Sequence, residues 1–205
     1  MLTIPDRDLL TVDPSIFIGA PALAGTVLLL ADDAAIIGTE LASDGSDFAA
    51  RGIDTGLVAV INDTVAVEIV SRTGATTLEV SLPRASIEDD QIPPGNATDG
   101  QLKIITFARM IDLQRSQLLQ GLGVEESSIV DAAPLTKLIV LRTIAHVLAH
   151  AAAAQPDDAS QQQRANLAAS QARQALHRTV LSVDAAGDGE ADTIRPVDVI
   201  RLTRG

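Results

Sequence analysis

Short apolar runs of β type alternate with turn residues between about Gly25 and Leu82. The runs are TVLLLA, AIIGTEL, LVAVI, TVAVEIV and TTLEVSL, and the first break between them is Asp32-Asp33. Alternating runs separated by Asp, Gly, Asn and Ser are typical of antiparallel hairpins. Asn62-Asp63 lies between two of the runs and has the chemistry of a tight turn that needs φ > 0. The pattern predicts a small antiparallel β module, a barrel or sandwich, over residues 25–83.

Segments rich in helix and strand breakers flank the predicted β module on both sides. Residues 1–24 contain Pro5, Pro14 and Pro21, which predicts an extended or briefly helical N-terminal arm. Residues 84–100 are polar and include the run PPGN, so we expect a linker there. The β module should therefore be bounded by two irregular segments.

Helical periodicity replaces the alternating runs over residues 101–180 and predicts three helices. Asp99 can cap the first helix, whose apolar positions are Leu102, Ile105, Ala108, Ile111, Leu118 and Leu122. The second follows Asp131 and stops at Gln155-Pro156, and the third begins at Asp157-Asp158 and ends near Thr179. Because only a minimal turn joins the last two helices, they should form an antiparallel hairpin. The predicted fold class is α+β.

Residues 181–205 predict a polar loop followed by a strand or extended tail. Val197, Val199 and Leu202 have near-alternating spacing in this tail. A strand with no partner in its own domain can add to the sheet edge of a neighbouring chain. Its arginines could then meet acidic groups of an adjacent copy. We expect intermolecular contacts through the tail, and pairing within the chain or a disordered tail is the alternative; the contact residues are Arg195, Val197, Val199, Arg201, Leu202 and Arg204.

The composition is apolar but nearly free of aromatic side chains. Apolar residues make up 46% of the chain, yet there are three Phe, no Trp, no Tyr and no Cys. Aliphatic side chains and Ala must therefore form the core, and disulfides and thiolate chemistry are excluded. The N-terminal sequence does not resemble a secretory leader, and apolar runs such as Val27–Leu30 are too short to span a bilayer. We expect a protein made in the cytoplasm that has no membrane partner.

Acidic residues are concentrated in the first half of the chain. The net charge is −12; residues 1–100 hold 16 acidic and 4 basic side chains, whereas residues 101–205 hold 11 of each. An acidic surface repels phosphate backbones, so nucleic-acid binding through the first half is disfavoured, although a local cluster such as Arg195, Arg201 and Arg204 could still contact DNA.

Two histidines have the spacing of a helical metal site. His146 and His150 are four residues apart, which places two imidazoles on one helical face. His177 is the third histidine, and the predicted hairpin keeps it about 18 Å along the axis from His146. No Glu follows His146 as zinc proteases require. We expect a solvated or intersubunit face rather than a metal site.

The loop DAAGDGEAD partly imitates a calcium loop. Asp184, Asp188, Gly189 and Asp192 occupy the first, fifth, sixth and ninth positions. The third position is Ala186, and the twelfth is Arg195 where calcium needs a bidentate Glu. A capped polar turn is therefore the prediction, with no metal and no cofactor.

Catalytic motifs are missing from the sequence. It has no G-x-S-x-G elbow, no G-x-x-x-x-G-K-[ST] phosphate loop and no G-x-G-x-x-G. Paired carboxylates could still meet in space, but a carbohydrate site normally adds stacking aromatic rings. We expect a protein that is not an enzyme, with a hydrolase or a sugar-binding β module as the alternative.

The order of the parts resembles the head-to-tail connector proteins of tailed bacteriophages, also called adaptor or head-completion proteins. In the β module the resemblance runs from Asp47-Phe48 through the valines of 58–70 to Thr76-Thr77-Leu78. In the helical part it runs from Phe107-Ala108 through Leu118-Leu119 to Leu122-Gly123. The match covers most of residues 1–125 and, more loosely, the rest.

The resemblance implies a structural virion protein of the phage neck. Such proteins form a ring of subunits, often twelve, that docks beneath the portal, contacts a tail-side neck protein and surrounds the channel through which DNA passes without sequence-specific contacts. The β module and the final Ala/Gln-rich helix are departures from that family. Another virion component, such as a tail terminator or decoration protein, is the alternative.

Overall fold

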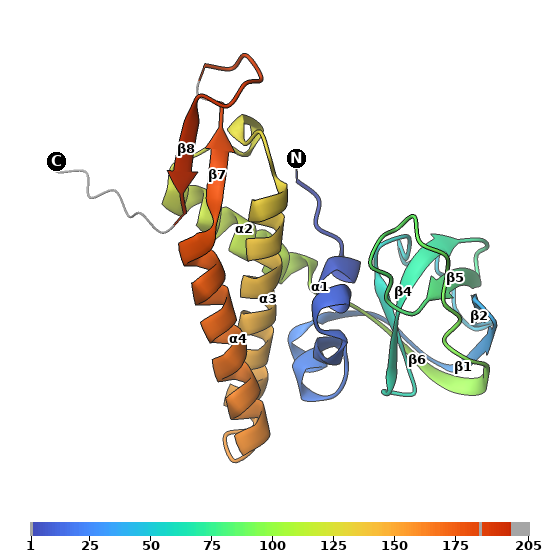
Figure 1. Ribbon diagram of the computed structural model, residues 1–205. Coiled ribbons are helices and arrows are strands. Elements are labelled where there is room, and N and C mark those ends of the chain that lie inside the picture. The colour runs from blue at the N-terminus through green and yellow to red at the C-terminus, as the bar shows by residue number, and fades with distance from the viewer. Residues whose placement is uncertain (1, 185, 198–205) are drawn as a thin grey trace. The chain divides into compact units, whose positions relative to one another are not determined.

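The computed structural model describes residues 2–184 and 186–197 and divides the chain into two compact units. We call Pro5–Ala108 the barrel unit and Met1–Ile4 together with Arg109–Gly205 the helical unit. Figure 1 shows the β-strands of the first and the long helices of the second. The predicted α+β class with a small antiparallel β module is confirmed.

Six antiparallel strands of the barrel unit close into a barrel. Their order around the barrel is β1-β2-β5-β4-β3-β6, and every neighbouring pair is antiparallel. Aliphatic side chains and Phe48 fill the interior, as the aromatic-poor composition requires. The strands are β1 (Thr26–Ile37), β2 (Glu40–Ala42), β3 (Val58–Ile61), β4 (Val65–Arg72), β5 (Thr77–Ser81) and β6 (Ala97–Thr106).

Two turn signals in the β module have different outcomes. Asn62 and Asp63 join β3 to β4 with φ of 51° and 52°, so the tight hairpin turn is confirmed. The expected break at Asp32-Asp33 is wrong, because β1 continues through it with shifts in its register against β6. A β-bulge accommodates the extra residues there without ending the strand.

The N-terminal segment, predicted as an extended or briefly helical arm over 1–24, is briefly helical and belongs to the barrel unit from Pro5 onward. Its elements are α1 (Asp6–Val12) and the 3₁₀ turns η1 (Pro14–Phe17) and η2 (Ala20–Ala24). Phe17 is fully buried and makes an edge-to-face contact with Phe107 at 5.1 Å between ring centroids. The prolines thus divide the segment into short packed turns instead of keeping it extended.

The segment predicted as a linker over 84–100 is attached to the barrel, and its last residues begin β6. The Ile92 N–H donates to Ser81 Oγ at 2.8 Å, and the Leu82 N–H donates to the Ile92 carbonyl at 2.8 Å. The first helix therefore begins at Ala108 rather than near Asp99. Leu102 and Ile105 fit helical spacing, but Leu102 and Ile104 also alternate and point into the barrel core.

A buried cluster of three charged side chains joins α1 to the outer wall of the barrel. Glu68 on β4 is 1% exposed, and its two carboxylate oxygens accept from Arg7 Nε at 2.6 Å and Arg84 Nε at 2.5 Å. Arg84 also donates to the carbonyls of Ile87 and Asp89. Buried charges need this complete pairing to be tolerated.

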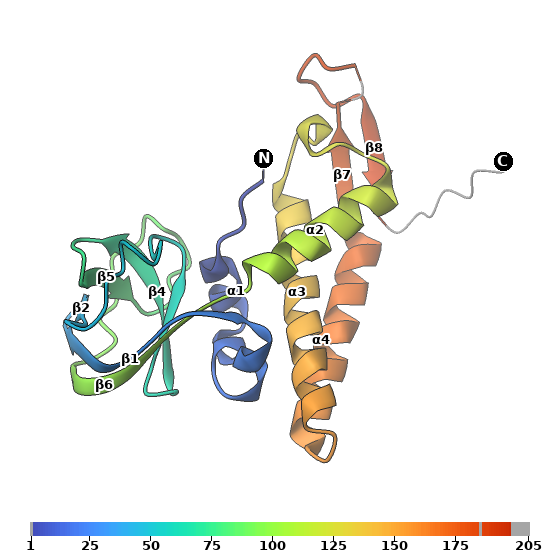
Figure 2. The same ribbon diagram turned by 180° about the vertical axis from the view of Figure 1, so that it is seen from behind.

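Three helices form most of the helical unit, as predicted. They are α2 (Ala108–Leu122), α3 (Ala133–Ala154) and α4 (Ala159–Arg178). Gly123 has φ of 59° just after α2, and Asp158 caps α4 by accepting from the Ser160 and Gln161 N–H groups. The expected α3–α4 hairpin is confirmed, and Figure 2 shows α2 lying across this pair. Two further short pieces belong to the same unit, the 3₁₀ turn η3 (Glu126–Ser128) and the hairpin β7 (Val180–Val183) with β8 (Thr193–Pro196).

The α3 helix is unusually apolar for its length. It is long and apolar enough to cross a membrane by length and composition alone, although each uninterrupted apolar run in the sequence is short. Half of its most apolar window is buried inside the protein, as in the core helix of a bundle. The α4 residues buried in the hairpin are all small: Ala165, Ala168 and Ala172.

Candidate assembly surface

The C-terminal segment in which we expected intermolecular contacts begins as a strand paired within its own chain. Arg195 lies opposite Leu181 in the β7–β8 hairpin. The Val197 N–H donates to the Thr179 carbonyl at 3.1 Å. Pairing within the chain, the alternative to intermolecular addition, therefore describes residues 193–197. The other expected contact residues lie outside the described residues: Val199, Arg201, Leu202 and Arg204.

The β7–β8 hairpin has one apolar face that is open in this structure. Ile194 is 72% exposed, and Val180 on the same face is also exposed. In an antiparallel pair, every second residue hydrogen-bonds to the partner strand. Because the Val197 N–H bonds to Thr179 of the β7 side, the backbone polar groups of residues 194 and 196 face the free edge of β8. Pro196 has no N–H to offer at that edge, which makes β8 a poor template for another strand. The face of this hairpin is better suited to contacts than its edge.

The α4 helix also presents an exposed apolar side chain. Leu167 is 60% exposed, on the side of α4 opposite the buried alanines. Gln171, Gln174 and Arg178 follow it by 4, 7 and 11 residues and so share its helical face. All three are exposed. The outward face of α4 therefore combines an apolar centre with amides and a cation.

Neither helix of the hairpin contains an acidic residue. The carboxylates Asp157 and Asp158 lie only in the turn between α3 and α4, whereas the helices carry five basic side chains: Lys137, Arg142, Arg164, Arg173 and Arg178. Within the described part of the chain, Lys137 and Arg178 have no carboxylate partner. Burial lowers the pKa of Arg142 from its ordinary value. The hairpin surface therefore has a positive bias although the whole protein is acidic.

The two expected histidine neighbours do lie together on α3. The rings of His146 and His150 are 4.8 Å apart between centroids and nearly perpendicular. Burial, followed by the charges of His150 and Arg142, lowers the pKa of His146. Among the described residues no third ligand-bearing side chain joins this pair in a metal-sized cluster. The arrangement favours a neutral imidazole within a polar stripe.

The loop after β7 brings its three aspartates together. Carboxylate oxygens of Asp184, Asp188 and Asp192 lie within 4.8 Å of one another. Asp184 accepts from the N–H groups of Gly189 and Gly187, and these bonds lower its pKa. Backbone donors thus already orient the central carboxylate, as in the predicted capped turn, and the absence of calcium binding remains a prediction.

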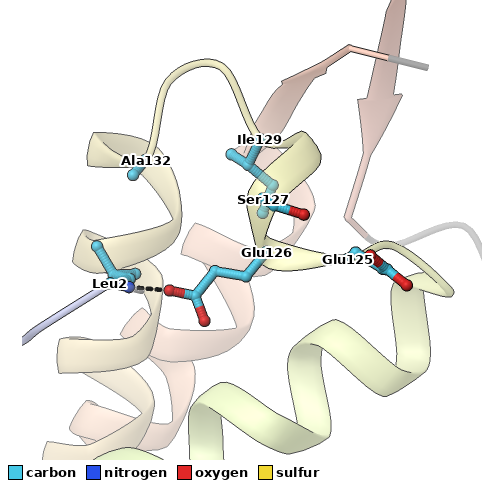
Figure 3. A pocket seen from close by; sticks show the side chains of 6 residues that line it. All are labelled: Leu2, Glu125, Glu126, Ser127, Ile129 and Ala132. Carbon is cyan, nitrogen blue, oxygen red and sulfur yellow. Dashed lines mark hydrogen bonds between the residues drawn. The ribbon is translucent and has the colours of Figure 1, made fainter. Parts of the chain in front are cut away.

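A hollow in the helical unit anchors the N-terminal residues of the chain. It measures about 640 Å³ and is lined by Leu2, Glu125, Glu126, Ser127, Ile129 and Ala132. Figure 3 shows Glu126 pointing toward Leu2 and Glu125 pointing away. The Glu126 carboxylate accepts a hydrogen bond from the Leu2 N–H. Arg115 donates to the Leu2 carbonyl at 2.7 Å. Glu126 and Arg115 thus hold the backbone of Leu2 from both sides of its peptide chain.

Sequence reasoning overlooked the α4 face as a specific site. It described the last helix as Ala/Gln-rich, whereas the useful signal was the absence of Asp and Glu from both helices of the hairpin. An acid-free pair of helices in a chain of net charge −12 is a marked local bias. No protein-family model, curated protein or solved structure matches this chain, so its surfaces and their chemistry carry the functional argument.

Proposed function

We propose that this protein is a structural virion component of a tailed-phage neck, which assembles into a ring between the portal and the tail. The observation that carries the proposal is the uncovered face of the helical unit, where Leu167 on α4 is 60% exposed. The open β7–β8 face, with Ile194, supports it. Large apolar side chains at the centre of amide-rich faces are typical of surfaces that are covered in an assembly.

The barrel unit supports a scaffold role in the same proposal. Across its described residues, 5–108, the barrel interior is occupied by the buried side chains of its own hydrophobic core, as is typical of small barrels. The barrel unit carries 16 acidic and 5 basic side chains, so its surface would repel DNA passing through a channel rather than retain it. These properties favour a connector over the alternative of a small ligand-binding barrel or hydrolase.

Electron microscopy of the purified chain and of phage particles tests the proposal. We expect closed rings in negative stain, with a single copy number by native mass spectrometry. Antibody against the chain should label tailed particles at the head–tail junction. Label spread over the capsid would instead support a decoration protein, and a chain that stays monomeric and labels no particle would contradict the proposal.

A further inference from the structure

An exposed apolar side chain also stands at the centre of an acidic surface on the barrel unit. Leu30 on β1 is 69% exposed. It lies between two shallow hollows of about 280 and 290 Å³, both of which it lines together with Asp32. The other carboxylates on the walls of these hollows are Asp33, Asp47 and Asp63. Arg51 and Lys103 line the hollows as well, and Lys103 pairs with Asp63 at 3.6 Å, so Asp32, Asp33 and Asp47 supply the excess negative charge. We call Leu30 with these four aspartates the acidic patch.

The bulged course of β1 builds the acidic patch. Leu29 points into the barrel core and is 5% exposed, whereas the next residue, Leu30, points outward. The register against β6 shifts between Ala31 and Ala34, which leaves both Asp32 and Asp33 exposed. Bulges of this kind re-aim side chains at functional surfaces.

Hydrogen bonds fix the position of one patch carboxylate before any partner arrives. The Ser43 hydroxyl donates to one oxygen of Asp33 at 2.5 Å, and the Gly45 N–H donates to the other at 2.6 Å. These bonds lower the pKa of Asp33, so this carboxylate stays ionised. An ordered anion beside an exposed leucine suits a partner that brings an apolar side chain and cations.

The outward face of α4 has the complementary composition. It offers Leu167 as an apolar centre, Gln171 and Gln174 as hydrogen-bonding amides, and Arg178 as a cation. The sequence of α4 contains no carboxylate that would be brought against the aspartates of the patch. The acidic patch and the α4 face therefore match in charge and in their apolar centres. Two acidic patches would repel each other, and two α4 faces would offer each other no opposite charge.

We propose that copies of this protein join head to tail, with the α4 face of one copy docked on the acidic patch of the next. The inference rests on the proposed ring-forming function and names the subunit contact within it. Because the two surfaces differ, each copy keeps one free surface after every step of association. Such a heterologous contact gives a closed ring when the rotation between copies closes, and an open chain when it does not.

Charges introduced at the two apolar centres test the contact. Leu30→Lys replaces the apolar centre of the patch with a cation that faces the positively biased α4 helix, and Leu167→Glu replaces the apolar centre of the α4 face with a carboxylate that faces the aspartates. Each variant should weaken subunit association by roughly 30-fold or more, the loss typical of an interface hot spot. Ile37→Lys on β1 and Leu113→Glu on α2 are matched controls at other exposed apolar positions, and both should assemble like the unmodified chain. Circular dichroism checks that each variant is folded.

Mixing two defective variants gives a sharper result. Leu30→Glu also removes the apolar centre of the patch, and this chain retains its α4 face, whereas the Leu167→Glu chain retains its acidic patch. An equimolar mixture should therefore form a complex of two chains and nothing larger, because the two altered surfaces are both acidic and repel each other. Analytical ultracentrifugation and native mass spectrometry measure the outcome.

A charge swap within one chain tests the same contact from the opposite direction. A chain that carries both Leu30→Lys and Leu167→Glu brings the introduced ammonium group of one copy against the introduced carboxylate of the next. This pairing should partly restore assembly relative to either single variant. A double variant that associates more weakly than both single variants would contradict the contact.

The outcomes separate this inference from the proposed function. Rings that form unchanged in the single variants, or a mixture that stays monomeric, would overturn the head-to-tail contact while leaving the ring function in place. Two-chain complexes in the mixture, together with open chains of the unmodified protein, would support the contact and count against the ring. An unmodified chain that is monomeric at every concentration would overturn both.

Discussion

The barrel unit pairs its buried charges internally, whereas the α3–α4 hairpin turns its cations outward. In the barrel unit, Glu68 is enclosed by Arg7 and Arg84 within hydrogen-bonding distance. On the hairpin, Lys137 and Arg178 have no carboxylate partner in the described ranges 2–184 and 186–197. The comparison shows that the barrel unit satisfies the charge of Glu68 with its own arginines, whereas the hairpin leaves cations at its surface.

Of the changes predicted here, removing the buried carboxylate of Glu68 should lower the stability of the protein most. Glu68→Ala would leave the buried guanidinium group of Arg84 without a counter-charge and the partly buried Arg7 with only Asp8, at 4.0 Å, which costs about 3–5 kcal/mol of unfolding free energy. Urea denaturation, followed by circular dichroism, measures the loss. Glu40→Ala removes an exposed carboxylate from the same barrel and should change stability by less than about 0.5 kcal/mol. Equal effects of the two substitutions would refute the structural role of the cluster.

The stability of the barrel unit should depend on pH through one buried acidic side chain, Asp6. Asp6 is 3% exposed and accepts from the Phe107 N–H at 2.8 Å, and burial raises its pKa from 3.8 to about 6. The folded state thus holds this proton more tightly than the unfolded state. Stability should rise as the pH falls from 6 toward 4, by at most about 3 kcal/mol from this group.

Asp6→Asn tests that assignment because it removes the titrating group and can keep the acceptor for Phe107. Urea denaturation near neutral pH and at about pH 5 should show a smaller pH dependence for this variant than for the unmodified chain. Glu40→Gln, at an exposed position, should retain the original dependence. An unchanged slope in Asp6→Asn would contradict the raised pKa.

Enlarging an alanine at the hairpin interface probes the weaker packing of the helical unit. Ala168 lies on the buried face of α4, so Ala168→Leu should overpack this face and lower the free energy of unfolding by about 1–3 kcal/mol. Ser170→Leu adds a larger side chain two residues later at an exposed position, and its effect should stay within about 0.5 kcal/mol. Thermal and urea denaturation compare the pair. Similar losses would show that the alanine contact is not close-packed.

Calcium should have the smallest effect of all. The amides of residues 187 and 189 already satisfy Asp184, and the sequence places Arg195 where a calcium loop needs a carboxylate. Adding calcium, or removing divalent ions with a chelator, should shift the melting temperature by less than about 1 °C. A rise of several degrees would make the aspartate loop a metal site and refute the capped turn.

Sequence periodicity predicted most elements, and it failed where two periods coincide. The turn at Asn62-Asp63 and the α3–α4 hairpin carry strong local signals and are correct. Leu102 and Ile105 satisfy a helical period, but Ile104 between them satisfies a strand period, and closure of the barrel decides in favour of β6. Long-range pairing of β6 with β1 and β3 has no local signature.

The candidate surfaces were only partly visible in the sequence for a related reason. The α4 face depends on local spacing and could have been recognised from the acid-free helices. The acidic patch depends on a bulge that exposes both Asp32 and Asp33 after the outward-facing Leu30, beside Asp47 and Asp63, which are distant in sequence. Such a juxtaposition follows from barrel closure and not from any motif.

The division of the helical unit along the chain has a consequence for the order of folding. The barrel unit is continuous in sequence, whereas Leu2 hydrogen-bonds to Arg115 and Glu126, more than a hundred residues later. During synthesis from the N-terminus, the barrel can close before the partners of Leu2 have been made. The segment that contains Leu2 then stays without these hydrogen bonds until α2 and η3 have been synthesised, so a segment translated before the barrel is placed only after the barrel has closed.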